Sequence, residues 1–134
     1  MPEMKILALY IAVIGLLAFG QGASSQTSED QISTKAVVIS VDATINPSTA
    51  EYITSGMNQA LEEKAECLII KLNTPGGLLK STRVIVTEML NSEVPVLVFV
   101  YPGGAQAASA GVFITLAGHI AAMAPGTNIG AAHP

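Results

Sequence analysis

The sequence has few of the residues that build disulfides and metal centres. Cys67 is its one cysteine and stands in an apolar run, and His119 and His133 are its two histidines, with no ligand spacing around either. A lone cysteine excludes an intrachain disulfide, and isolated histidines do not predict a metal site. We therefore expect neither a metal nor any other cofactor.

Charged and aromatic residues are also scarce. Only 12% of the residues are charged and 4% are aromatic, and the net charge is -4 at pH 7. A nucleic-acid site needs basic side chains that neutralise phosphates, or aromatic rings on which bases stack. The composition offers neither, so nucleic acid is not an expected partner.

A targeting segment is the first feature that the sequence does contain. Lys5 precedes a charge-free apolar stretch from Ile6 to Phe19, and small or polar residues follow up to Ser25. This order is typical of a secretory signal peptide, and an uncleaved membrane anchor also fits it. We expect residues 1–24 to be one or the other, 25–35 to be a polar linker, and a domain at 36–134 to lie outside the cytoplasm.

Strand and helix patterns alternate through the expected domain. Apolar, β-branched runs predict strands at Ala36–Val41, Cys67–Leu72, Pro95–Tyr101 and Ile120–Met123. Helical spacing separates the first three runs, after Pro47 and over Leu78–Leu90. After Pro47, the apolar residues that share one helical face are Ile53, Met57, Ala60 and Leu61. The alternation predicts an α/β fold with mainly parallel strands joined by crossovers.

Two loops of small residues follow successive strands. Thr74-Pro75-Gly76-Gly77 comes after the second strand, and Ala107–Gly111 comes after the third, at a helix that should begin between Gln106 and Ser109. In a parallel sheet, the loops at the carboxyl ends of neighbouring strands converge on one crevice. The two loops are therefore expected to meet.

Ser109 is the candidate nucleophile where these loops meet. A serine at a helix start projects its hydroxyl while the next N–H, of Ala110, points toward the same space. The N–H of Gly76 or Gly77 would complete an oxyanion hole, because glycine lets a substrate backbone approach closely. Taken separately, the small residues around Ser109 also fit a tight helix contact, and the glycine pair also fits a simple turn.

Three runs, LNTPGGLL, YPGGAQAASAG and above all HIAAMAPGTNIGAAHP, resemble signatures of the NfeD family of membrane-bound serine proteases of the ClpP class. The resemblance implies a ClpP/crotonase-like β-α spiral and an ATP-independent endopeptidase with Ser109 as nucleophile and Gly76 and Ala110 as oxyanion donors. It further implies that the substrates are hydrophobic segments of membrane-associated proteins, such as the C-terminal tail of a stomatin partner. Domains of this fold commonly form homo-oligomers.

The general base is the part of the site that the sequence does not supply. The family uses a Ser-Lys dyad, yet no lysine follows Lys80, so the family lysine would fall beyond Pro134. We therefore expect a domain that is incomplete at its C-terminus and nearly inactive alone, because a serine needs a base to take its proton. His133 matches the position of the ClpP triad histidine and is the alternative base, although Asp30 and Asp42 both lie upstream.

Two other functions remain open at this point. A crotonase-fold acyl-transfer enzyme would use the same paired N–H groups on a thioester, but Glu88 and Glu93 are the only carboxylates after Thr74. A catalytically inactive scaffold would keep the fold for association. If the chain is a peptidase, Leu78-Leu79 and Val112-Phe113-Ile114 favour apolar peptides.

Overall fold

The computed structural model describes residues 34–132. The predicted leader at 1–24, most of the linker at 25–35, and His133 therefore lie outside the described residues. Along the chain the elements are β1 (Ala36–Asp42), α2 (Pro47–Glu62), β2 (Cys67–Asn73), α3 (Leu79–Leu90), β3 (Val96–Val100), β4 (Gln106–Ala108), α4 (Ala110–Ala117), β5 (Ile120–Met123) and β6 (Asn128–Gly130). The predicted alternation of strands and helices is confirmed.

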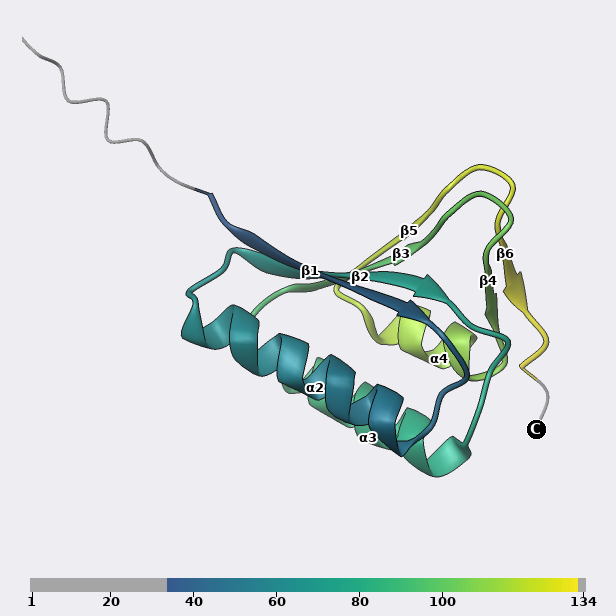
Figure 1. Cartoon of the computed structure of the whole chain (residues 1–134), viewed down its shortest axis with the longest axis horizontal. Helices are drawn as coiled ribbons and strands as arrows, with labels where there is room; N and C mark the ends of the chain where they lie inside the picture. Colours follow the sequence, from purple (N-terminus) through teal and green to yellow (C-terminus); the bar gives the residue numbers. More distant parts are fainter. Residues whose placement is uncertain (1–33, 133–134) are drawn as a thin grey trace, which may run out of the picture. The chain divides into compact units, whose positions relative to one another are not determined.

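A four-stranded parallel sheet in the order β1-β2-β3-β5 forms the centre of the fold. Every second side chain of β1, β2 and β3 is buried, and α2, α3 and α4 lie on one side of the sheet (Figure 1). Burying one such aliphatic side chain contributes about 1.5–3 kcal/mol. The core of these strands consists of Val37, Ile39, Val41, Leu68, Ile70, Leu72, Val96, Val98 and Val100.

Helix α2 begins where local side-chain chemistry favours a helix start. The Asn46 side chain accepts a hydrogen bond from the Thr49 N–H at 3.0 Å, and Pro47 occupies the first turn, where no N–H is needed. Ile53, Met57 and Ala60 are buried, as the helical spacing predicts. The prediction that Leu61 shares this face is wrong, because its side chain is 48% exposed.

The segment after β3 does not lead directly into a helix, which corrects the expectation of a helix that begins between Gln106 and Ser109. Residues Gln106–Ala108 form β4, and α4 starts at Ala110. Strand β4 pairs in parallel with β6, and these two strands form a sheet of their own beyond the main one (Figure 1). Ser109 is consequently the link between a strand and a helix.

Candidate active site

Ser109 has a backbone conformation that non-glycine residues rarely adopt, with φ 51° and ψ -107°. A residue in such a region costs about 1–3 kcal/mol unless its surroundings hold it there. Its N–H donates to the Gly130 carbonyl at 2.8 Å, and its carbonyl accepts from the Val112 N–H at 3.0 Å. The half-buried serine thus turns sharply from β4 into α4, held on both sides by main-chain hydrogen bonds.

The loop of residues 74–77 lies directly against Ser109, as the parallel topology predicted. Thr74 donates its N–H to the Gln106 carbonyl at 2.7 Å, and its own carbonyl accepts from the Ala108 N–H at 3.0 Å. A Cβ placed on Gly76 would lie 2.9 Å from Ser109 Cβ and 3.4 Å from Ser109 Oγ. Gly76 also has φ +119°, so only glycine suits this position.

The two loop glycines differ in what their N–H groups do. Gly76 is buried, and its N–H donates to Thr74 Oγ1 at 3.1 Å. Gly77 is exposed, and its N–H has no acceptor within residues 34–132. The Gly76 carbonyl and the Leu78 N–H both bond to Ile45, at 2.8 Å each, so the N–H of Gly77 between them points away from Ile45. This geometry favours Gly77 over Gly76 as the oxyanion donor from this loop.

Ala110 is the first residue of α4, and its N–H also lacks an acceptor in the described part of the chain. The first N–H groups of any helix have no partner within the helix, and the helix dipole favours negative charge near them. Within residues 34–132, the two N–H groups without an acceptor, on Gly77 and Ala110, therefore belong to the neighbours of Gly76 and Ser109, which contact each other. Such a pair can stabilise the oxyanion that forms when a serine attacks a carbonyl carbon.

No base contacts the candidate nucleophile in the described structure. Across residues 34–132, Ser109 Oγ makes no hydrogen bond. His119 lies at the amino ends of β3 and β5, where its Nδ1 accepts from the Val96 N–H at 3.1 Å and its N–H donates to the Val96 carbonyl at 2.9 Å. Ser109 lies past the carboxyl end of β3, so His119 has a structural role at the other end of the sheet. His133 and its hypothetical role as base lie outside the described residues.

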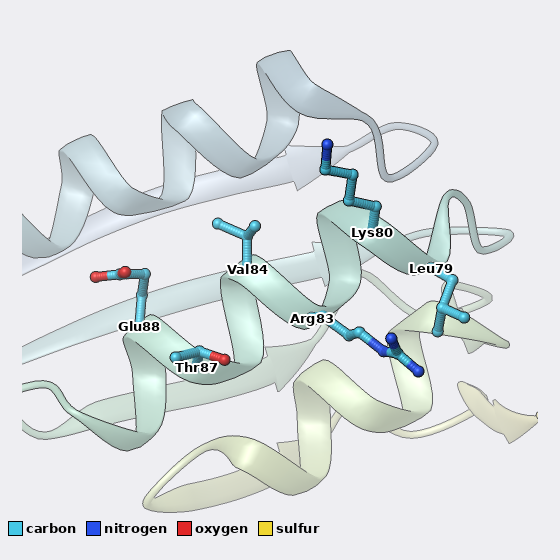
Figure 2. A pocket seen from close by; sticks show the side chains of 6 residues that line it. All are labelled: Leu79, Lys80, Arg83, Val84, Thr87 and Glu88. Carbon is cyan, nitrogen blue, oxygen red and sulfur yellow. The ribbon is translucent and has the colours of Figure 1, made fainter.

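The predicted apolar side chains fall into two groups. Leu78, Leu79 and Phe113 are exposed, but Ile114 is fully buried in the core and cannot line a cleft, which corrects that part of the expectation. An apolar groove of about 670 Å³ runs between α3 and α4. A second hollow lies along the outer side of α3, with Lys80, Arg83 and Glu88 at its edges (Figure 2). Neither hollow includes Ser109 or Gly77 among its lining residues.

No group of three or more His, Cys, Asp or Glu residues between 34 and 132 is arranged to hold a metal ion. In the same part of the chain, no helix has the length and apolar character that a membrane crossing requires.

The sequence pattern missed the contribution of Thr74. Its fully buried hydroxyl is the acceptor that takes up the Gly76 N–H. A threonine two residues before a glycine can form this kind of turn, so the signal was present in the sequence. It could not be interpreted without knowing that β4 lies on the other side of the loop.

The parallel sheet, the glycine loop and the serine at a strand-to-helix turn define a ClpP/crotonase-like fold with a hydrolase-type constellation. ClpP1 from Listeria monocytogenes matches with a TM-score of 0.59 and 25% identity, over 67% of this chain and 52% of that chain. A mutant of the 1510-N membrane-bound stomatin-specific protease, solved with a substrate peptide, matches with a TM-score of 0.74 and 40% identity, over 75% of this chain and 46% of that one. The predicted fold class is confirmed.

The family model described as the N-terminal domain of NfeD1b matches residues 35–134, and the chain belongs to this family. Membrane-bound protease PH1510 of Pyrococcus horikoshii is 51% identical over 75 residues, which are 56% of this chain and 17% of that protein. Membrane protein NfeD1b of Bacillus subtilis is 35% identical over 95 residues, 71% of this chain and 21% of that protein. The chain thus spans about a fifth of these curated relatives, and the predicted family is confirmed.

Proposed function

We propose that this chain contributes the nucleophile and the oxyanion hole of an ATP-independent serine endopeptidase associated with the cytoplasmic membrane, with the protease domain outside the cytoplasm. The observation that carries the proposal is the contact between Ser109 and the glycine loop, in which the adjacent Gly77 and Ala110 have N–H groups without an acceptor in residues 34–132. Relatives named as membrane-bound proteases support the same reading.

In the proposed reaction, Ser109 Oγ attacks the carbonyl carbon of a peptide bond while a base accepts its proton. The carbonyl oxygen becomes an oxyanion that accepts hydrogen bonds from the N–H groups of Gly77 and Ala110. The base then protonates the leaving amine, and water hydrolyses the acyl-enzyme by the same two steps. Losing one oxyanion donor costs other acyl-transfer enzymes about 2.7–4 kcal/mol, so the paired donors are central to the rate.

A lysine beyond Pro134 is the proposed base. The support is that solved forms of the 1510-N protease include a lysine-to-alanine mutant with a substrate peptide and a serine-to-alanine mutant. Lys71 is unsuited to this role, because its Nζ lies over the Tyr101 ring, 5.4 Å from the centroid, on the sheet. We further propose that the substrate is an apolar segment of a stomatin-like membrane protein and that the enzyme is a homo-oligomer. The exposed side chains of Leu78, Leu79 and Phe113, on the segments that follow the two site loops, support the apolar preference.

The test is labelling of the full-length protein with a fluorophosphonate probe, which forms a covalent bond with activated serines. Wild type and Ser40→Ala should be labelled and Ser109→Ala should not, because Ser40 is an exposed residue on β1 and only Ser109 lies beside the oxyanion donors. Cleavage of apolar peptides should disappear in the same variant.

An inactive scaffold is the second candidate, and the observation that favours it is the absence of any hydrogen bond to Ser109 Oγ within residues 34–132. A folded full-length protein that resists the probe would overturn the peptidase proposal. That result would support the scaffold or an acyl-transfer enzyme of the same fold that has no serine nucleophile.

A further inference from the structure

Thr74 occupies a place between the two halves of the candidate oxyanion hole. Its side chain is 0% exposed. The hydroxyl accepts a hydrogen bond from the Gly76 N–H at 3.1 Å and lies 3.2 Å from the Gly76 carbonyl, to which it donates. Both hydrogen-bonding roles of the hydroxyl are therefore used within the glycine loop.

The remainder of Thr74 is tied to the segment that carries the nucleophile. Its main-chain N–H and carbonyl both bond to β4, the strand that immediately precedes Ser109. A Cβ built on Gly111 would lie only 2.8 Å from the Thr74 Cγ2 methyl. This methyl therefore packs against the first turn of α4. One residue thus contacts the loop of Gly77 and the helix start of Ala110.

The hydroxyl of Thr74 also determines which N–H of the glycine loop has no acceptor in the described part of the chain. Because it holds the Gly76 N–H inside the loop, the peptide unit between Pro75 and Gly76 is fixed. The next N–H belongs to Gly77, an exposed residue, and has no acceptor in residues 34–132. An oxyanion donor must lie within about 2.7–3.1 Å of the developing charge, so a small rotation of this loop would remove it from the reaction.

We propose that Thr74 is a positioning residue for the oxyanion hole, an inference that rests on the proposed peptidase function. Its hydroxyl orients the Gly77 N–H, and its main chain, which bonds to β4, holds the glycine loop against the segment of Ser109. Thr74 touches no reacting atom. Its effect is therefore on the transition state, in which the oxyanion exists, and not on the binding of the uncleaved peptide.

The experiment compares Thr74→Val, which removes the hydroxyl at nearly constant shape, with Thr74→Ser, which keeps it. The matched control is Thr115→Val, because Thr115 is also buried, at 2% exposure, and its hydroxyl also bonds to a main-chain carbonyl, that of Gly111 at 2.7 Å. In the full-length enzyme, Thr74→Val should lower kcat about 10- to 100-fold at a nearly unchanged KM, since misplacing a reacting group by about 1 Å can cost 10²-fold. Thr74→Ser and Thr115→Val should stay within about threefold of wild type.

A second readout separates positioning from general loosening of the fold. The inhibition constant of a peptide aldehyde should rise in Thr74→Val by the factor by which kcat falls, because the hemiacetal oxygen occupies the oxyanion hole. The affinity of the uncleaved peptide, measured in the Ser109→Ala background, should not change. Should Thr74→Val not fold, Thr74→Cys takes its place against Thr74→Ser, because a thiol is a weak hydrogen-bonding group.

Failure of the proposed role of Thr74 and failure of the proposed peptidase function give different results. A wild-type enzyme that does not react with the fluorophosphonate overturns both. If wild type reacts and Thr74→Val keeps its kcat, or if Thr74→Val and Thr74→Ser lose kcat equally, the positioning role of the hydroxyl is wrong and the peptidase function stands.

Discussion

Two glycines with positive φ allow the contact between the glycine loop and Ser109 to be tested apart from backbone strain. Gly76 has φ +119° and Gly104 has φ +87°. An alanine at either position pays for an unfavourable backbone conformation, at about 1–3 kcal/mol. Around Gly104 the added Cβ would meet nothing within 4 Å, whereas on Gly76 it would lie 2.9 Å from Ser109 Cβ.

We therefore expect Gly104→Ala to lose about 1–3 kcal/mol of unfolding free energy and to keep its reactivity. Gly76→Ala should lose about 1–3 kcal/mol more, because an extra methyl group in a packed site forces neighbouring groups to move. The group that must move is Ser109 itself, since the other neighbours of the added Cβ are the Ala108 carbonyl oxygen and Ser109 Oγ, both at 3.4 Å.

The assay combines chemical denaturation followed by circular dichroism with the rate of fluorophosphonate labelling. Gly76→Ala should be labelled about 10-fold more slowly than Gly104→Ala, since misplacing a reacting group by about 1 Å can cost 10²-fold. Equal labelling rates in the two variants, with both proteins folded, would refute the placement of Gly76 against the nucleophile.

Two further changes test local interactions away from the site. Asn46→Ala should lower the unfolding free energy by about 0.5–2 kcal/mol, because the Thr49 N–H loses its cap at the start of α2, and denaturation measures this loss. The Lys35 ammonium, 2.6 Å from Glu63 Oε2, and then the Gln59 amide hold the pKa of Glu63 below its ordinary value. The stability from this pair is present above the unfolded carboxyl pKa and lost as pH falls through the folded pKa, so Lys35→Met should raise the Glu63 pKa in an NMR titration. An unchanged pKa in Lys35→Met would contradict the pairing.

The main sheet could be predicted from sequence because its signals are local. The runs that contain Val37, Leu68 and Val96 are apolar and β-branched over short lengths, and each ends in residues that break strands. Once the strands are taken as parallel, the encounter of the glycine loop with Ser109 follows from topology alone. The prediction that the two loops meet was correct because it depends on the order and direction of the strands and not on any particular side-chain contact.

Strand β4 could not be predicted in the same way. Gln106–Ala108 consists of small or helix-compatible residues, and its strand partner, Asn128–Gly130, lies more than a helix and a strand further along the chain. Whether Gly76 or Gly77 is the oxyanion donor could not be predicted from the sequence for the same reason. It depends on where one hydroxyl, that of Thr74, points after the loop has packed against β4.

The run HIAAMAPGTNIGAAHP was the most specific signature in the sequence, and the structure gives most of it a physical role. Its first residue ties β5 to β3 through Val96, and its middle forms β6, which pairs with β4. The Gly130 carbonyl at the end of β6 then accepts the N–H of Ser109 at 2.8 Å. This hydrogen bond helps to hold Ser109 at a positive φ. The signature therefore supports the candidate nucleophile through the main-chain carbonyl of Gly130, and no side chain of the signature is needed for this effect.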